Sequence, residues 1–128
     1  MAPDPKATVT RLIEEVINGG DLELIHELYA PAMAAPARRW IAPFRSAFPD
    51  VEMQIVDLIA EGEKVAGRFK CSGTHLGEWR GEPATGRRFE RVDEVYFFRI
   101  ADGRITEAWG LEDTASRLRQ LGSEGRPT

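Results

Sequence analysis

The strongest local structural signal in this chain is Arg99-Ile100-Ala101-Asp102-Gly103-Arg104-Ile105-Thr106-Glu107-Ala108-Trp109. Apolar residues flank an Asp-Gly pair, a pattern that predicts two antiparallel strands joined by a two-residue turn. Such a turn needs positive φ, which Gly103 adopts without steric cost. The stretch therefore predicts a β-hairpin whose strands cover residues 87–100 and 104–111.

Upstream of the hairpin, the spacing of apolar residues changes from helical to alternating at about residue 50. Alternation predicts further strands that begin at Val51 and at Glu63, the second of them ending at His75. The last helix is expected to begin at an Asp113 cap and to end at Gly122. Residues 1–6 are expected to fray, and residues 123–128 to be disordered.

Helical spacing before residue 50 predicts three helical segments. The first covers residues 8–18, and Asp21 caps a second segment that Pro31 closes. The third holds Trp40, Ile41, Phe44 and Phe48, and Pro43 inside it predicts a kink or a restart. Helices followed by antiparallel strands indicate a single α+β domain over residues 1–128, with an ordered core of about residues 7–122.

Composition narrows the class of protein. The chain has 128 residues, of which 42% are hydrophobic and 30% charged, which is ordinary for a globular domain. A net charge of −4 without a basic cluster argues against nucleic-acid binding, and no apolar run is long enough to span a membrane. The single Cys71 and the lack of a leader pattern predict a cytoplasmic protein. No metal-ligand spacing or phosphate loop is present, so we expect neither metal nor cofactor.

Four further motifs accompany the hairpin, namely Asn18-Gly19-Gly20-Asp21, Ala47-Phe48-Pro49-Asp50, Gly73-Thr74-His75-Leu76-Gly77-Glu78 and Pro83-Ala84-Thr85-Gly86-Arg87. In order and spacing the chain resembles the SnoaL-like polyketide cyclases, a branch of the nuclear transport factor two-like superfamily, from about residue 7 to residue 122. The resemblance implies a cone-shaped, curved antiparallel sheet of four to six strands wrapped on helices around a cavity. It also implies cofactor-independent acid/base cyclisation or isomerisation of an apolar, ketone-bearing small molecule of secondary metabolism.

The chain departs from the cyclases at the position that matters most for that chemistry. The resemblance places their acid/base aspartate at Gly110, and their second polar residue, His or Asp, at Tyr96. In one interpretation Glu94, on the same strand face, replaces the aspartate, and Tyr96 donates a hydrogen bond to a carbonyl oxygen. In a second, Gly110 enlarges the cavity of a non-catalytic small-molecule-binding module. In a third these residues are structural, and Glu94 pairs with an arginine such as Arg68 or Arg91.

Several other side chains are candidates for the site. His75 is either a proton shuttle at the mouth of the cavity or a residue that orients its loop. Glu112 is a candidate substitute for the missing aspartate. The remaining residues expected to contact the ligand are Trp40, Phe44, Val92, Phe98, Ala108 and Gly110.

Alternation also bears on assembly. Val92, Glu94, Tyr96, Phe98 and Ile100 share one face of their strand, whereas the other face carries Asp93, Val95, Phe97 and Arg99. Both faces are largely apolar, and the few helices cannot cover both. We therefore expect a homodimer in which the second face packs against another subunit.

Overall fold

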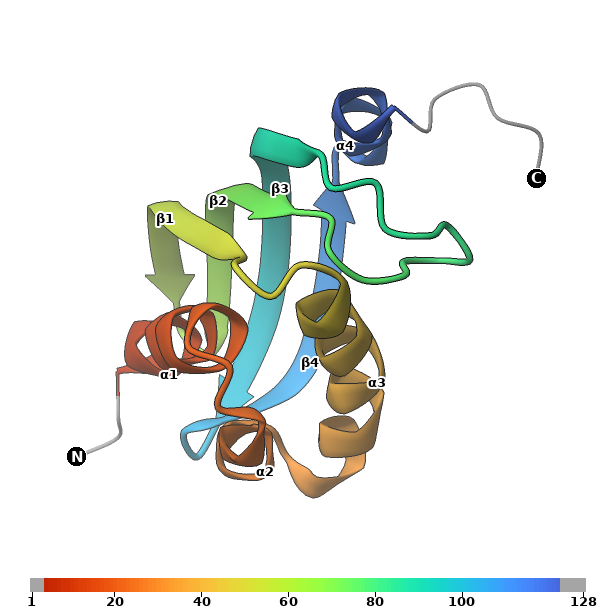
Figure 1. The fold of residues 1–128 in the computed structure, drawn as a ribbon. Coiled ribbons are helices and arrows are strands. Elements are labelled where there is room, and N and C mark those ends of the chain that lie inside the picture. Colours follow the sequence, from red (N-terminus) through yellow and green to blue (C-terminus); the bar gives the residue numbers. More distant parts are fainter. Residues whose placement is uncertain (1–3, 123–128) are drawn as a thin grey trace.

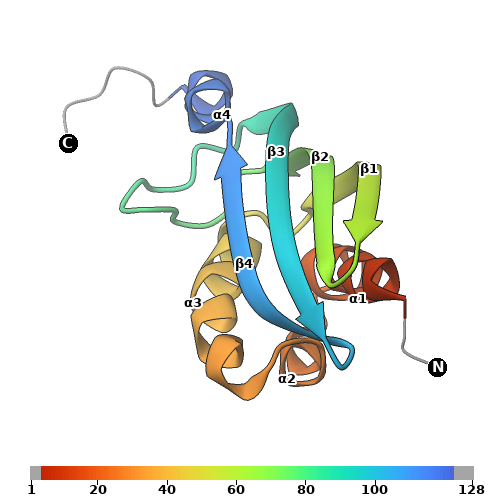
Figure 2. The ribbon, with the colours of Figure 1, turned by 180° about the vertical axis from the view of Figure 1, so that it is seen from behind.

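The computed structural model describes residues 4–122, and its centre is one antiparallel sheet with the strand order β1-β2-β3-β4. The strands are β1 Glu52–Glu61, β2 Lys64–Thr74, β3 Arg88–Ala101 and β4 Arg104–Glu112. The sheet is curved, and the first three labelled helices lie on one side of it (Figure 1). Seen from behind, no helix of the described residues covers the opposite face (Figure 2). The predicted α+β cone is confirmed.

The hairpin forms as predicted. Asp102 and Gly103 both have positive φ, 53° and 76°, as a primed two-residue turn requires. The helix after β4 is also confirmed, because the Asp113 carboxylate accepts a hydrogen bond from the Ser116 N–H at 3.0 Å and Gly122 ends the helix in the left-handed conformation.

The N-terminal helical segments differ from the predictions at their ends. Helix α1, Pro5–Arg11, begins earlier than expected because the Asp4 carboxylate caps it, and it continues as the π-helix η1, Leu12–Asn18. Residues 5 and 6 are therefore helical, while residues 1–3 and 123–128 lie outside the described part. A short 3-10 turn, η2 Leu22–Leu24, leads into α2, Ile25–Leu28. Asp21 makes no side-chain capping bond, so that predicted cap is wrong.

Helix α3, Pro31–Ala47, is one continuous helix that does not restart at Pro43. Pro31 does not close the preceding helix but begins this one, since proline at the first helical position loses no helical hydrogen bond. Pro36 and Pro43 each remove one hydrogen bond. Burial of one face compensates for this loss, with Ala34, Ala37, Ile41, Phe44 and Ala47 turned into the core.

Strand β4 contains an irregularity that alternation does not predict. Arg99 pairs with Glu107 but Ile100 pairs with Ile105, which leaves Thr106 as an extra residue. Ile105 consequently turns to the core side and is fully buried, not exposed beside Trp109 as strict alternation predicts. Beyond the bulge the alternation resumes, and Tyr96 lies directly opposite Gly110. None of the helices between residues 4 and 122 is long and apolar enough to cross a membrane.

Candidate functional site

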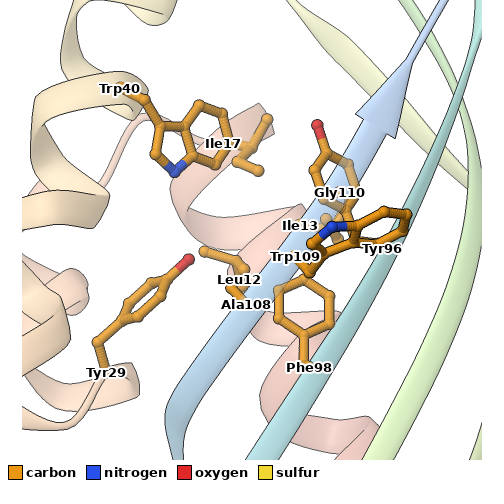
Figure 3. A pocket seen from close by; sticks show the side chains of 10 residues that line it. All are labelled: Leu12, Ile13, Ile17, Tyr29, Trp40, Tyr96, Phe98, Ala108, Trp109 and Gly110. Carbon is orange, nitrogen blue, oxygen red and sulfur yellow. The ribbon is translucent and has the colours of Figure 1, made fainter.

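An apolar cavity of about 130 Å³ lies between the helices and strands β3 and β4 (Figure 3). A cavity of roughly this size accommodates one benzene ring. One wall is formed by segment η1, by Tyr29 just after α2, and by Trp40 of α3, and the two strands form the other. The lining residues are Leu12, Ile13, Ile17, Tyr29, Trp40, Tyr96, Phe98, Ala108, Trp109 and Gly110.

Gly110 leaves room for the aromatic ring of Tyr96. A Cβ atom added at Gly110 would lie 2.2 Å from Cδ1 and 2.3 Å from Cε1 of Tyr96, far inside van der Waals contact. The ring therefore occupies the volume that a side chain at residue 110 would fill. Gly110 does not enlarge the cavity, contrary to the second interpretation, because Tyr96 takes up the space.

Tyr96 belongs to a buried hydrogen-bond network. Its hydroxyl donates to Oε1 of Glu94 at 2.6 Å, and the other carboxylate oxygen of Glu94 accepts from Nη2 of Arg117 at 2.5 Å. Arg117 also donates from Nη1 to Glu112 at 2.6 Å. Glu94 is 2% exposed and Arg117 is fully buried. The network links strands β3 and β4 to helix α4, Thr114–Leu121.

Arg117 is the member of this network that the sequence patterns did not predict. Glu94 does pair with an arginine, as the third interpretation requires, but the partner is neither Arg68 nor Arg91. The guanidinium carbon of Arg117 also lies 4.7 Å from the centre of the Phe89 ring. One signal was present in the sequence, because Arg117 precedes the buried Leu121 by four residues and so shares its helix face.

Burial and the neighbouring charges shift the pKa values of Glu94 and Tyr96. Burial raises the pKa of Glu94, while the positive charge of Arg117 and the hydrogen bond from Tyr96 act in the opposite direction. Burial also raises the pKa of Tyr96, and the neighbouring Glu94 charge adds to the effect. Tyr96 is therefore a neutral phenol whose hydrogen points to Glu94. It can donate to a ligand only when Glu94 carries a proton and reverses the direction of their hydrogen bond.

The other predicted ligand-binding residues divide between two cavities. Trp40, Phe98 and Ala108 line the cavity of Figure 3 together with Tyr96 and Gly110. Phe44 and Glu112 line a neighbouring cavity of about 400 Å³ instead, and Trp40 borders both. Val92 is buried in the core and lines neither of these two cavities.

His75 is fully buried and does not lie at the mouth of the cavity. Its Nδ1 accepts a hydrogen bond from the Thr85 N–H at 3.3 Å and lies 3.0 Å from the Thr85 hydroxyl oxygen. Backbone hydrogen bonds from His75 to Arg87 and from Gly86 to His75 close the same loop. This placement fits a residue that orients its loop. Between residues 4 and 122, no three His, Cys, Asp or Glu side chains form a group that could hold a metal ion.

Comparisons with known proteins give the class to which this fold and cavity belong. The family of SnoaL-like polyketide cyclases matches residues 7–121, so the chain belongs to that family. The aklanonic acid methyl ester cyclase DauD of Streptomyces sp. (strain C5) is 32% identical over 112 residues, which cover 87% of this chain and 67% of that protein.

Solved structures agree on the fold. IdmH of Streptomyces antibioticus, assigned as a polyketide cyclase, is 31% identical with a TM-score of 0.81, over 94% of this chain and 99% of that one. AclR of Streptomyces galilaeus, assigned as a hydroxylase, is 25% identical with a TM-score of 0.84, over 97% and 84% of the two chains. Similar folds thus carry differently assigned reactions, so the reaction must be argued from the site.

Proposed function

We propose that this protein is a cofactor-independent cyclase that binds one ring of a ketone-bearing polyketide and drives its cyclisation or isomerisation by proton transfer. The observation that carries the proposal is the apolar cavity of single-ring size with Tyr96, hydrogen-bonded to Glu94, in its wall. Membership in the SnoaL-like polyketide cyclase family supports the same substrate class.

In the proposed mechanism, the Tyr96 hydroxyl accepts the proton from the substrate carbon while its own hydrogen passes to Glu94. The carbanion then forms the new C–C bond to a second carbonyl, whose oxygen gains the negative charge. When Glu94 carries a proton, it donates to the Tyr96 hydroxyl, and the phenolic hydrogen becomes available to a substrate carbonyl. Burial raises the pKa of Glu94 and so favours the protonated carboxyl that this step needs. Arg117 opposes that protonation, and its charge therefore tunes how readily Glu94 takes the proton.

The size of the cavity indicates how a larger substrate is held. At about 130 Å³ it admits one ring, and the rest of a polycyclic molecule has to lie outside. Trp40 borders the cavity and is 41% exposed, which makes it an apolar platform for the outer part of the substrate. We infer that only the reacting ring enters the protein.

Turnover of aklanonic acid methyl ester, the substrate in the name of DauD, tests the proposal. We expect a product of unchanged mass, because an intramolecular aldol closure moves a proton and forms a C–C bond without losing an atom. Glu94→Gln and Tyr96→Phe are each expected to lower kcat by about 100-fold or more, since each removes one member of the proton path. Glu90→Gln, an exposed carboxylate of the same strand, serves as the matched control.

Two outcomes would contradict this assignment in different ways. Unchanged kcat in Glu94→Gln and Tyr96→Phe would show that proton transfer uses other groups. Saturable binding of the ester by the wild-type protein without any conversion would favour the non-catalytic binding module. Liquid chromatography with mass and chiral detection separates substrate, product and stereoisomers in both cases.

We infer further that two copies pair through the uncovered face of the sheet. Ile59, Ala66, Phe97 and Trp109 are successive cross-strand neighbours and form one row across all four strands. Phe97 is 49% exposed and Trp109 is 56% exposed, and the centres of their rings lie 5.8 Å apart. An apolar row of this kind is typical of a protein–protein interface. The single Cys71 is in keeping with a reducing compartment, so a cytoplasmic location stays a prediction.

The oligomeric state tests this inference. Phe97→Glu places a charge in the middle of the row, and we expect it to convert a dimer into a monomer at micromolar concentration. Multi-angle light scattering after size exclusion measures the molar mass directly. Glu14→Lys, an exposed charge change in segment η1 on the helical side of the sheet, is the control expected to stay dimeric. A wild-type protein with the mass of a monomer would refute the dimer.

A further inference from the structure

Tyr29 is a buried phenol whose hydroxyl has no hydrogen-bond partner among residues 4–122. The side chain is 2% exposed, and it points from the helical wall into the cavity (Figure 3). The hydroxyl oxygen is not among the fully buried polar atoms, so a ligand in the cavity can reach it. Tyr96, on the opposite wall, differs in this respect because its hydrogen is already given to Glu94.

The backbone on both sides of Tyr29 is fixed. Its N–H donates to the Ile25 carbonyl at 3.0 Å, and the N–H of Ala30 donates to the Ile105 carbonyl of β4 at 2.9 Å. Tyr29 thus joins the end of α2 to the edge strand, with an isolated bridge to Ile105. The phenol is held in place before any ligand arrives, so little conformational entropy is lost when the hydroxyl makes a contact.

The surroundings of this hydroxyl determine what it can bind. Leu12, Ile13 and Ile17 make the adjoining wall apolar. Burial raises the pKa of Tyr29, so the group is a neutral donor throughout the physiological range and does not act as a base. Two indole N–H groups belong to the lining residues, but Trp40 is half-exposed and the Trp109 ring packs against Phe97 on the uncovered face of the sheet. A ligand ring that fills the cavity therefore needs one acceptor oxygen at its Tyr29 side.

We propose that Tyr29 is a specificity-determining residue whose hydroxyl donates a hydrogen bond to a carbonyl oxygen on the ring that enters the cavity. This inference rests on the proposed function, because it takes the cavity to be the ligand site. In this arrangement the ligand has two oxygens that the protein binds. Tyr29 on the helical wall binds one carbonyl oxygen, and Tyr96 on the strand wall binds the oxygen that reacts. The ligand class is a cyclic or aryl ketone with apolar substituents.

Two matched probes test the hydrogen bond. Para-fluoroacetophenone carries a carbonyl oxygen, whereas para-fluoroethylbenzene has nearly the same shape without one, and fluorine NMR follows the titration of each. Tyr29→Phe removes only the hydroxyl. We expect it to weaken binding of the ketone by about three- to tenfold and binding of the hydrocarbon by less than twofold.

The possible outcomes separate this inference from the function on which it rests. If Tyr29→Phe weakens both probes equally, or leaves ketone binding unchanged, Tyr29 does not recognise the oxygen, while the cavity is still a ligand site. If neither probe binds the wild-type protein saturably up to its solubility, the cavity is not a ligand site and both proposals fail. Thermal unfolding of the variant checks that a loss of binding does not arise from a loss of fold.

Discussion

Replacing Arg117 by methionine is expected to destabilise the fold by about 3–5 kcal/mol at neutral pH and by much less at pH 5. The change leaves the hydrophobic contacts of the side chain largely intact but removes the positive charge beside Glu94, which is 2% exposed. A buried carboxylate without a counter-charge is costly, so the carboxyl of Glu94 takes up a proton instead. Loss of the positive charge costs less free energy at the second partner, Glu112, because its side chain is 26% accessible to water.

The sign of the pH dependence follows from that proton. Burial alone raises the pKa of Glu94, and removal of Arg117 takes away the charge that opposes the rise. The folded variant then holds a proton that the unfolded chain releases above about pH 4.3. Its free energy of unfolding should fall by up to about 1.4 kcal/mol per pH unit as pH rises from there to the pKa in the folded state.

Urea unfolding of the wild type, Arg117→Met and Arg117→Met/Glu94→Gln between pH 5 and pH 8 measures this effect. The double variant has no ionisable group at residue 94, so we expect its stability to lose the slope of the single variant and to exceed it at pH 8. A single variant with a pH-independent penalty would mean that lost packing, and not an unpaired charge, causes the destabilisation.

The parts of the fold that were predictable from sequence are those fixed by local backbone chemistry. Asp102-Gly103 forms the predicted turn because positive φ is required there, and Asp113 and Gly122 bound the last helix through contacts within a few residues. The end residues of the strands were predicted to within a few positions because apolar alternation covers most of each strand. Such signals do not depend on where other elements lie.

The errors arise where tertiary packing overrides local preference. Pro36 and Pro43 weaken a helix locally, yet α3 runs through both because its buried face packs against the core. Strict alternation put Ile105 on the outer face, and the bulge at Thr106 reverses that assignment. No residue of the hairpin indicates a bulge by type alone, since neither glycine nor proline occurs at Thr106.

Only part of the candidate site was predictable from sequence, because the rest depends on tertiary packing. Strand alternation correctly puts Glu94 and Tyr96 on one face, whereas the pairing of Tyr96 with Gly110 depends on the bulge, which no residue type indicates. The partner of Glu94 was missed because it comes from α4, whose position over β3 depends on the whole sheet. A charged residue on an amphipathic helix is usually exposed, and Arg117 is an exception because two carboxylates neutralise it.

Gly110→Ala is expected to destabilise the protein by about 1–3 kcal/mol, a penalty that disappears when Tyr96 is also truncated. The added methyl group would lie 2.2 Å from Cδ1 of Tyr96, so either the ring or strand β4 has to move. The cycle of Gly110→Ala, Tyr96→Ala and the double variant, measured by chemical denaturation, isolates this contact. Additive penalties would show that the ring does not fill the space over residue 110.

Gly110→Asp extends the argument to chemistry, because the resemblance places the cyclases' acid/base aspartate at residue 110. We expect this variant to lose stability as Gly110→Ala does and to gain no activity, because the ring of Tyr96 occupies the volume that the carboxylate needs. Tyr96→Ala/Gly110→Asp frees that volume and is expected to regain stability relative to Gly110→Asp alone. The tyrosine at 96 and a side chain at 110 are alternative occupants of one space. The glycine and the tyrosine are therefore a coupled change, and the network from Tyr96 through Glu94 to Arg117 is the arrangement that this coupling permits.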